Sequence, residues 1–564
     1  MKVLIVGGVA GGASAAARMR RMDENAQIIL FERGPYISFA NCGLPYYISR
    51  TIGTKDDLLV QTPESFYGRF RVEVRTQEEV IAIDREHKTV RVRRGEGDIY
   101  EEGYDKLILS PGADAVLPGA IRGLNSQGVF VLRSVPEVVA IDRWIEERRV
   151  KHAVIAGGGY IGIELAENLR ERGLEVTVVE LASHVIGSID EEIAHIAEKE
   201  LEKHGINLRL NCGITAIEEK ENGLHITTTD GSLEAGLAVI SVGVKPNSDL
   251  AREAGLELGF RGCIAVNDRM QTSDPDIYAV GDAVEVTEFV TGQKRHIALA
   301  GPANRQGRIA ANQIAGMDSR YKGTQGSSII KVFDIAVAAT GLTEAAAKAA
   351  GIDCDKVYLH SGAHAGYYPG AKPLTLKIVF ERATGRLLGG QFVGAEGADK
   401  RCDVLAVAIR AGLTAMDLAD LELCYAPPYN SAKDPLNMAG FAIENIVTGK
   451  VKNFHWEQVP ALDGEAVTLL DVRTDNEYAQ GSVPGFVHIP LHELRERIGE
   501  LPKEKPVYVH CFSGLRSYVA CRILTGHGYD CYNISGGYRM YGEILPPDWN
   551  ESEEGSMLRA AEVK

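Results

Sequence analysis

The sequence is poor in cysteine for its length. Its 564 residues include nine cysteines, an odd number that is scattered along the chain. Such a set does not form a disulfide framework, and it suits a reducing compartment. We therefore expect a cytoplasmic protein.

Long apolar runs and excess positive charge are also lacking. No apolar stretch approaches the roughly 18 residues of a membrane span. The N-terminal run is too short for a signal-peptide core and leads directly into a glycine turn. The net charge of −16 argues against nucleic acid or an anionic membrane as the main partner, although it does not exclude a local basic pocket.

A strand–glycine–helix unit begins near residue 152. Its turn, GGGYIG at 157–162, matches G-x-G-x-x-G through Gly157, Gly159 and Gly162. Glycines allow a tight turn and close approach of the backbone to a pyrophosphate, and the helix N-terminus presents N–H groups to the phosphates. Glu180 ends the next strand, where an acid binds ribose hydroxyls and repels a 2′-phosphate. The unit predicts an NADH site, with a plain glycine turn as the alternative.

A similar unit opens the chain. Its turn, GGVAGG at 7–12, keeps Gly7 and Gly12 but has Val9 where the second glycine is expected. This departure weakens the dinucleotide motif. Glu32, at the end of the following strand, supports the motif because it stands where a ribose-binding acid is expected.

Three further segments carry a family resemblance. They are SPGA at 110–113, which ends in Ala113, GVKPN at 243–247, and TSDPDIYAVGD, which ends in Asp282. With the glycine units, they make residues 1–446 resemble the pyridine nucleotide–disulfide oxidoreductase family. The resemblance implies that Asp282 binds the ribityl chain of FAD, and it assigns FAD to the first unit and NADH to the second. A helix-capping or turn acid is the alternative for Asp282.

The segment SFANCGLPYY at 38–47 holds a single cysteine, Cys42, soon after the first glycine unit. Dithiol members of the family carry C-x4-C here, but Tyr47 occupies the second position, so no internal disulfide is expected. The oxidised form is then a mixed disulfide, a persulfide or a sulfenic acid. An inert buried thiol is the alternative. We expect Cys42 to lie near the flavin, with a pKa lowered by a helix N-terminus or by the flavin.

The same segment is similar to the motif of the coenzyme A–disulfide reductases. This resemblance implies a homodimer in which Tyr367 and Tyr425 reach the active site of the other subunit. There a phenol could protonate the leaving thiolate. Interface packing is the alternative role for both tyrosines.

Coenzyme A carries phosphates, so it requires cations. Arg18 and Arg21 share one face of the first helix at i, i+3 spacing, and we expect them to bind the nucleotide end of coenzyme A. A solvated basic helix face is the alternative. Ser38 and Asn41 are expected to hydrogen-bond the pantetheine arm.

A second reactive cysteine lies near the C-terminus. The segment HCFSGLRS at 510–517 follows an apolar strand and contains Cys511 and Arg516. A strand-to-helix turn there would point backbone N–H groups at the sulfur and stabilise a thiolate and then a persulfide, with Arg516 adding charge. Residues 462–550 resemble a rhodanese domain, including its early D-x-R…E signature at 471–477, which we expect to be mainly structural.

These motifs predict an α/β protein. It should contain two Rossmann-like dinucleotide-binding domains, an α+β dimerisation domain and a C-terminal α/β rhodanese domain. The expected bounds are 1–112 and 245–322 for the FAD-binding domain, 113–244 for the NADH-binding domain, 323–446 for the dimerisation domain, 447–461 for a linker, 462–550 for the rhodanese domain and 551–564 for a polar tail.

The implied activity is reduction of a sulfur compound by NADH through FAD and Cys42. The substrate is coenzyme A persulfide, polysulfide or coenzyme A disulfide, and Cys511 transfers sulfane sulfur. One alternative is an NADH oxidase or peroxidase that uses a Cys42 sulfenic acid. Another is a redox-sensing or sulfur-carrier protein. We expect no nucleic acid, no membrane partner and no resident metal.

Overall fold

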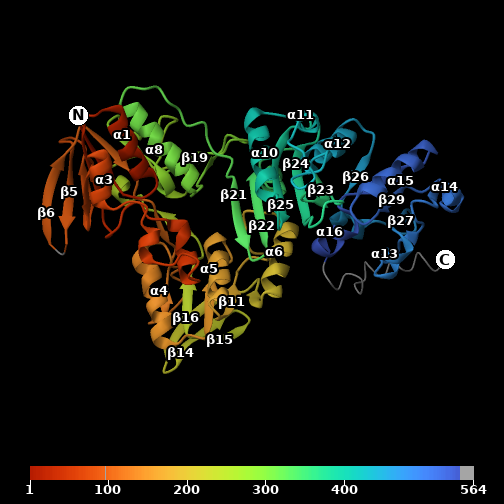
Figure 1. Cartoon of the computed structure of the whole chain (residues 1–564), viewed down its shortest axis with the longest axis horizontal. Helices are drawn as coiled ribbons and strands as arrows, with labels where there is room; N and C mark the ends of the chain where they lie inside the picture. The colour runs from red at the N-terminus through yellow and green to blue at the C-terminus, as the bar shows by residue number, and fades with distance from the viewer. Residues whose placement is uncertain (96, 546–564) are drawn as a thin grey trace. The chain divides into compact units, whose positions relative to one another are not determined.

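The computed structural model describes residues 1–95 and 97–545 (Figure 1). Its contacts divide the chain into two compact units. The first combines Met1–Ile186 with Leu201–Gly326, and the second combines Gly187–Glu200 with the chain from Ser327 onward. The expected tail at 551–564 and the last part of the expected rhodanese range, 546–550, lie outside the described residues.

The first unit opens with a five-stranded parallel sheet in the order β18-β7-β1-β2-β3. Aliphatic residues dominate its strands, as expected for a parallel sheet that is covered on both faces. The strands are β1 (Lys2–Val6), β2 (Gln27–Glu32), β3 (Glu73–Thr76), β7 (Lys106–Leu109) and β18 (Ile277–Ala279). Since β18 comes from far along the chain, two separated stretches of sequence build this sheet.

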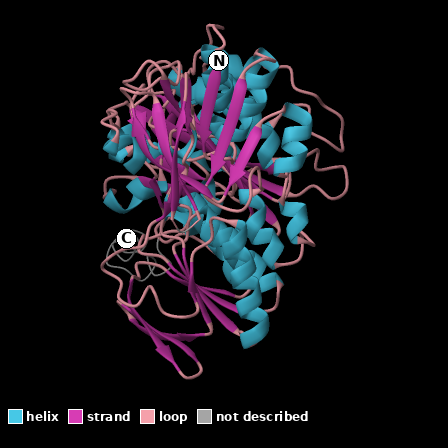
Figure 2. Cartoon of the chain, turned by 90° about the vertical axis from the view of Figure 1, so that its left-hand side faces the viewer, coloured by secondary structure: helices cyan, strands magenta, loops and turns pink. Residues whose placement is uncertain are grey.

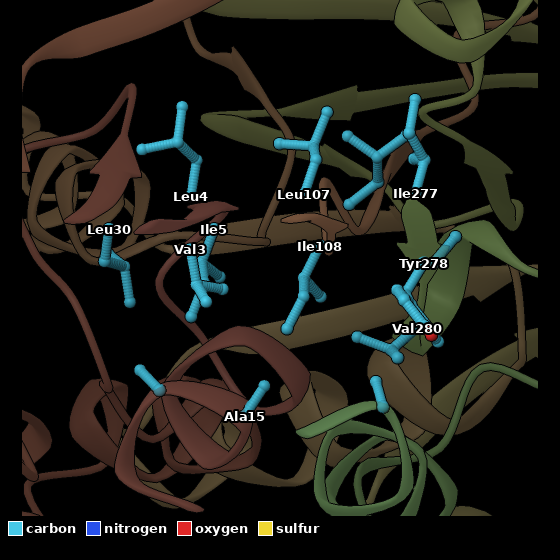
Figure 3. Packing of buried hydrophobic residues seen from close by; sticks show 14 of the residues in the cluster. Val3, Leu4, Ile5, Ala15, Leu30, Leu107, Ile108, Ile277, Tyr278 and Val280 are labelled. Carbon is cyan, nitrogen blue, oxygen red and sulfur yellow. The ribbon is translucent and has the colours of Figure 1, made fainter. Parts of the chain in front are cut away.

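Side chains from this sheet form a buried core. Figure 3 shows Leu4, Leu107 and Ile277 on one face of the sheet, while Ile108 points to the other face, toward the helix that carries Ala15. The helices are α1 (Gly11–Met22), α2 (Leu44–Ile48), α3 (Pro63–Phe70), α7 (Asp249–Glu253) and α8 (Ala300–Ile314). An antiparallel sheet of β4 (Glu78–Asp84), β5 (Thr89–Arg94) and β6 (Asp98–Gly103) lies beside them, and β19 (Val286–Thr287) pairs with β20 (Lys294–Arg295).

A second parallel sheet follows, in the order β12-β11-β10-β16-β9. Its strands are β9 (Val129–Phe130), β10 (His152–Ala156), β11 (Glu175–Val179), β12 (Ile206–Arg209) and β16 (Leu237–Ile240), with helices α4 (Val135–Arg148) and α5 (Tyr160–Glu171). An antiparallel sheet of β13 (Ile214–Lys220), β14 (Gly223–Thr228) and β15 (Gly231–Ala235) adjoins it. The chain crosses between the two parallel sheets on β8 (Ala113–Ala115) and returns on β17 (Val244–Pro246), and these two strands pair antiparallel.

The second unit contains an antiparallel five-stranded sheet in the order β21-β22-β25-β24-β23. The strands are β21 (Ser328–Val332), β22 (Ile335–Gly341), β23 (Cys354–Gly362), β24 (Pro373–Glu381) and β25 (Leu387–Gly394). The helices are α9 (Glu344–Ala349), α10 (Ala398–Ala411), α11 (Ala415–Asp420) and α12 (Pro435–Val447). Figure 2 shows the strands gathered into sheets with helices against them.

Helix α6 (Glu191–Lys203) departs from the expected organisation. Its sequence lies inside the range expected for the NADH-binding domain, yet most of it groups with the second unit. The reason is a buried ion cluster. The Nζ atom of Lys377, on β24, lies 2.8 Å from a carboxylate oxygen of Asp190 and 2.5 Å from one of Glu192. A buried ammonium surrounded by carboxylates holds its partners firmly because separating them would leave uncompensated charges.

The C-terminal part of the second unit is a parallel sheet in the order β26-β30-β29-β27-β28. Its strands are β26 (Lys452–Phe454), β27 (Thr468–Asp471), β28 (Val487–His488), β29 (Val507–His510) and β30 (Cys531–Ile534). The helices are α13 (Asp475–Ala479), α14 (Leu494–Arg497), α15 (Leu515–Gly526) and α16 (Gly537–Ile544).

The segment expected as a linker, 447–461, is instead part of this structure. It contributes β26, which pairs with β30, and then the short helix η5 (Trp456–Ala461). The Trp456 side chain is fully buried, and its Nε1 donates a hydrogen bond to the Gly537 carbonyl at 2.7 Å. β26 has three residues, too few to show the alternating apolar and polar pattern of a strand. The sequence at this edge of the sheet is therefore typical of a connector.

Among the described residues, no helix combines the length and apolar character needed to cross a bilayer.

Candidate active site

A cavity of about 660 Å³ lies at the carboxyl ends of the strands in the first parallel sheet. Ligands of open α/β sheets bind at this edge. Predicted residues from five segments line the cavity, namely Gly7, Glu32, Asn41, Ala113 and Asp282. The fold therefore brings together residues that the sequence analysis could connect only through motifs.

The glycine turn of this cavity leaves no room for side chains. Gly7 has φ +97°, and a Cβ atom there would lie 2.0 Å from the Ser110 carbonyl oxygen. A Cβ atom at Gly12 would lie 1.9 Å from the Gly7 carbonyl oxygen. The Gly8 N–H donates to a Glu32 carboxylate oxygen at 2.9 Å. The turn forms although Val9 replaces the second glycine of the motif. The backbone clashes that exclude a side chain occur at the first and last glycines, Gly7 and Gly12.

Arg133 is a residue of this site that the sequence analysis missed. Its guanidinium donates to the Ala113 carbonyl at 2.9 Å and lies 3.4 Å from an Asp282 carboxylate oxygen. Arg133 also lines the cavity. No motif surrounds it in the sequence, so only the fold shows that this arginine joins the crossing segment to Asp282.

The second glycine turn repeats the same construction. Gly157 has φ +104°, and a Cβ atom at Gly162 would lie 2.0 Å from the Gly157 carbonyl oxygen. Glu180 accepts the Gly158 N–H at 2.6 Å, as Glu32 does in the first turn. A Cβ atom at Gly159 would have no neighbouring atom within 4 Å, so the outer face of this glycine is open to a ligand. The turn and its acid suit the pyrophosphate and ribose of a dinucleotide.

Cys42 is exposed and lies in the short helix η1 (Asn41–Gly43), directly before α2. Loss of solvent around the sulfur, with the nearby carboxylates of Glu164 and Asp282, raises the pKa of Cys42, and Arg133 opposes this. The direction is opposite to the lowered pKa that we expected from a helix N-terminus. The reason is that desolvation of the sulfur, together with the two acids, outweighs the single cation Arg133.

A carboxyl group from the second parallel sheet's helix α5 approaches this cysteine. Tyr46, on α2, donates a hydrogen bond from its hydroxyl to Glu164 at 3.4 Å. Burial, with repulsion from Glu167, raises the pKa of Glu164 to about 7, and the Tyr46 hydrogen bond opposes this. No sequence pattern pointed to Glu164, since an acid in the first turns of a helix is common.

A basic pocket of about 340 Å³ is formed in part by Ser38, on the segment that leads to Cys42. Four arginines line it, Arg18, Arg21, Arg69 and Arg308. Burial and the neighbouring cations Arg308 and Arg21 lower the pKa of Arg18. A cluster of cations that repel one another is a good binding site for an anion with several charges.

Ser38 also lines this basic pocket, whereas Asn41 lines the larger cavity. The segment that leads to Cys42 therefore contributes residues to both cavities. Arg69 and Arg308 were missed in the sequence because α3 and α8 meet α1 only in the fold. Arg20 takes no part, since its guanidinium is buried and donates to backbone carbonyls, including that of Phe70 at 2.8 Å.

Tyr367 and Tyr425 lie together in the second unit. Their hydroxyl oxygens are 2.6 Å apart, and the side chains are 75% and 47% exposed. Tyr368 and Tyr429 are exposed beside them in sequence. The mutual hydrogen bond raises the pKa of Tyr367. Exposed tyrosines at this density are typical of a surface that another protein covers.

Cys511 is buried at the end of β29, where the chain turns into α15. Its Sγ accepts hydrogen bonds from the Gly514 N–H at 3.1 Å and from the Ser517 hydroxyl at 3.5 Å. Gly514 has φ +102°, which favours glycine and brings its N–H toward the sulfur. The motif predicts several backbone N–H donors here, whereas one backbone N–H and one hydroxyl donate to the sulfur.

The Arg516 guanidinium interacts with both Glu477 and the Cys511 sulfur. Its hydrogen bonds to Glu477 contribute most to the raised pKa of Arg516, and the charge and hydrogen bond of Cys511 add to this. The two terminal nitrogens of Arg516 donate to the two carboxylate oxygens of Glu477, each at 2.7 Å. Arg473 and Asp471 form a second pair that is completely buried, at 2.7 Å. The early signature therefore supplies one buried ion pair, Asp471 with Arg473, and Glu477 as a partner for Arg516.

Three parts of the chain match known families. Residues 1–307 match the pyridine nucleotide-disulphide oxidoreductase family, and residues 327–435 match its dimerisation domain. Residues 458–543 match the rhodanese-like domain. The chain belongs to the pyridine nucleotide-disulphide oxidoreductase family. The predicted resemblance and α/β fold are thus confirmed, and membership of this family of oxidoreductases implies FAD and NAD(P)H as cofactors.

Relatives within the family align with most of the length of this chain. A coenzyme A disulfide reductase of Staphylococcus aureus (strain JH9) is 40% identical over 449 residues, which are 78% of this chain and 99% of the relative. A crystal structure of reduced Bacillus anthracis CoADR-RHD is 48% identical, with a TM-score of 0.95, over 97% of this chain and 98% of that chain. An NAD-dependent persulfide reductase from A. fulgidus is 37% identical, with a TM-score of 0.90, over 96% and 100% of the two chains.

Proposed function

We propose that this chain is an NADH-dependent flavoprotein that reduces coenzyme A persulfide, polysulfide or coenzyme A disulfide through Cys42. The observation that carries the proposal is the position of Cys42, an exposed single thiol that follows Ser38 of the basic pocket and Asn41 of the dinucleotide cavity and lies near Asp282 and Arg133 of that cavity. The names of the similar proteins, a coenzyme A disulfide reductase and a persulfide reductase, support the same chemistry.

The residues of the larger cavity fit FAD. The glycine turn at Gly7 and Gly12 and the N-terminus of α1 suit its pyrophosphate, Glu32 its ribose and Asp282 its ribityl chain. When bound, FAD passes two electrons from NADH to a sulfur–sulfur bond. Glu180 would bind the ribose of NADH and repel a 2′-phosphate, so we propose NADH over NADPH.

The basic pocket would hold the nucleotide end of coenzyme A. Arg18, Arg21, Arg69 and Arg308 supply cations for its phosphates, and Ser38 lies where the chain turns from this pocket toward Cys42. The pantetheine arm would then follow the 38–42 segment to the sulfur.

The Cys42 thiolate attacks the sulfur–sulfur bond of the substrate. With coenzyme A disulfide, a Cys42–coenzyme A disulfide forms and one coenzyme A thiolate leaves. Two electrons from NADH then break the mixed disulfide, which releases the second thiolate and restores Cys42. With coenzyme A persulfide, the same balance yields coenzyme A and hydrogen sulfide.

The tyrosine pair would act on the leaving thiolate. We propose a homodimer in which Tyr367 and Tyr425 of one copy reach Cys42 of the other, because their exposed hydroxyls are poised to donate a proton. Cys511 would carry sulfane sulfur as a persulfide in its cradle of N–H and hydroxyl donors.

Anaerobic rates of NADH oxidation test the proposal. The holoenzyme and Cys42→Ser would be compared with coenzyme A persulfide, coenzyme A disulfide and, separately, oxygen as acceptors. We expect the sulfur substrates to be preferred and Cys42→Ser to lose about 100-fold or more in rate on them. Parental rates for Cys42→Ser, or turnover dominated by oxygen, would overturn the proposal.

A further inference from the structure

The two tyrosines of the proposed active site lie on separate loops. Tyr367 lies between β23 and β24, and Tyr425 lies between α11 and α12. The segments around them, 363–368 and 424–430, form neither helix nor strand, so no regular ladder of hydrogen bonds fixes their backbones. Their hydroxyl oxygens are nevertheless only 2.6 Å apart. Contacts outside the regular elements must therefore hold the two segments together.

Asn430 joins both tyrosine segments. Its side chain is fully buried, and its amide nitrogen donates a hydrogen bond to the Cys424 carbonyl at 3.1 Å. Its backbone carbonyl accepts the Ala365 N–H, also at 3.1 Å. Cys424 directly precedes Tyr425, and Ala365 lies two residues before Tyr367. One buried residue thus determines where both tyrosine-bearing backbones lie.

Arg401, on α10, orients this asparagine. Its guanidinium is buried, and one terminal nitrogen donates to the Asn430 amide oxygen at 2.9 Å and to the Ala363 carbonyl at 3.0 Å. Its Nε donates to the Asp434 carboxylate at 3.1 Å, which compensates the charge. The planar guanidinium fixes the directions of these bonds, so Arg401 contacts both tyrosine segments in one defined geometry.

Asn430, Arg401 and Asp434 form what we call the buried clamp. Burial of a charged pair is costly, and packed apolar residues would hold the domain together equally well. In the part of the chain that the structure describes, the clamp has no buried polar side-chain atom without a partner. Asp434 also accepts the Leu436 N–H at 2.8 Å. A polar network that is fully satisfied favours one arrangement of the segments it joins.

We propose that Asn430 and Arg401 are positioning residues for the tyrosine pair. They hold the two segments so that the hydroxyls of Tyr367 and Tyr425 meet before substrate binds. This inference rests on the proposed role of the pair in donating a proton to the leaving thiolate. A preorganised donor acts on the chemical step, so the clamp contributes to kcat and not to KM.

Rates of NADH oxidation by the holoenzyme with coenzyme A disulfide test the clamp. Asn430→Ala removes the side-chain bonds to Arg401 and Cys424, so kcat should fall about 10- to 100-fold while KM stays within about twofold. The same substitution should cause no further loss in the Tyr367→Phe/Tyr425→Phe background, because nothing is left to position. A defect in folding alone would lower the rate by the same factor in both backgrounds.

Asn430→Asp is a milder variant that decides the question if Asn430→Ala fails to fold. The new side chain has nearly the same shape and still accepts a hydrogen bond from Arg401. Its second carboxylate oxygen repels the Cys424 carbonyl, so only the segment of Tyr425 is released. Asn430→Asp should therefore lower kcat as much as Tyr425→Phe does, and the two substitutions together should lower it no further.

Asn437→Ala is the matched control. Asn437 is also a buried asparagine of this domain, but its amide nitrogen donates to the carbonyls of Leu418, Ala419 and Leu421, outside both tyrosine segments. Its loss should lower the stability of the domain and leave kcat within about twofold of the parent. A loss of kcat equal to that of Asn430→Ala would overturn the inference.

The outcomes separate the clamp from the proposed function. If Tyr367→Phe/Tyr425→Phe keeps the parental kcat, the proposed role of the tyrosines is wrong, and the clamp falls with it. If that variant is slow, but the Asn430 variants keep the parental kcat, raise KM instead, or slow the tyrosine variant further, only the clamp is wrong.

Discussion

At the scale of single residues, the environment of Cys42 is set by groups on three separate segments. Glu164 comes from α5, Asp282 from the short helix η4 (Gly281–Ala283) and Arg133 from the residues before α4. The two acids disfavour the thiolate and the arginine favours it. Since the pKa of Glu164 is raised to about 7, its effect on Cys42 changes within the physiological pH range.

Substitution of Glu164 should therefore change the reactivity of Cys42 in a pH-dependent way. Below pH 7 the Glu164 carboxyl is largely neutral and Glu164→Gln should have little effect. Above that pH the ionised carboxylate is removed, the pKa of Cys42 falls, and alkylation of the reduced holoenzyme by iodoacetamide should become severalfold faster.

Glu171→Gln, at the far end of the same helix, is the control and should leave the alkylation profile unchanged. An acceleration by Glu164→Gln that is equal at pH 6 and pH 9 would show that the carboxylate does not act through its charge.

Substitutions in the two glycine turns should affect different cofactors, flavin for the first turn and NADH for the second. Gly7→Ala places a Cβ atom against the Ser110 carbonyl at positive φ, so the protein should be isolated with little flavin. Gly159→Ala meets open space and should retain flavin, measured as the ratio of visible to ultraviolet absorbance, while raising the KM for NADH. Loss of flavin from Gly159→Ala would contradict the assignment of the two turns.

At the scale of elements, the strands and helices that carry long motifs were predictable. The runs KIVFE at 377–381 and GGQFVG at 389–394 are typical of strands, and the alanine-rich stretch around 402–411 is typical of a helix. These segments form β24, β25 and α10. Aliphatic runs between glycines predict strands and turns well, because a buried strand requires apolar residues and a tight turn often requires glycine.

Short elements and tertiary contacts were not predictable in the same way. β26 has three residues, and its pairing with β30 depends on contacts far along the chain. Separate helices and loops meet at the two cavities and at Cys42 only in the folded chain. This meeting places four residues that no motif marks, namely Arg69, Arg308, Arg133 and Glu164. The sequence could show which segment holds a reactive cysteine, but not which charges surround it.

The corrected role of the 447–461 segment can be tested through Trp456. Trp456→Ala removes a fully buried indole and its hydrogen bond to Gly537, which should cost about 3–5 kcal/mol of stability in the C-terminal sheet. The buried thiols of Cys521 and Cys531 report on this sheet, and they should become alkylated at lower urea concentration.

Trp144→Ala, in the second parallel sheet's helix α4, is the control. It should leave the urea midpoint for Cys521 and Cys531 unchanged. An unchanged midpoint for Trp456→Ala would mean that the segment is a linker after all.

At the scale of the whole molecule, we propose that two copies of the chain build each active site together. Cys42 and the tyrosine pair lie in different compact units, and the tyrosine pair is exposed. If two copies share an active site, the exposed tyrosine pair of one copy can act on Cys42 of the other. The match to a dimerisation domain supports this arrangement.

Mixed dimers can detect shared sites. A Cys42→Ser chain and a Tyr367→Phe/Tyr425→Phe chain are each expected to form poorly active homodimers. If each site takes its cysteine from one copy and its tyrosines from the other, the mixed dimer contains one intact site and should recover about half of the parental rate. No recovery after subunit exchange would indicate that each copy acts alone.

The most direct test of the central claim is to identify the residue that holds the substrate. The holoenzyme with Cys42 in its thiol form would be incubated anaerobically with coenzyme A disulfide in the absence of NADH, digested and analysed by mass spectrometry. We predict one coenzyme A per chain, attached to Cys42 and released by one equivalent of NADH. Turnover with coenzyme A attached to another of the nine cysteines, or with none attached, would contradict the account.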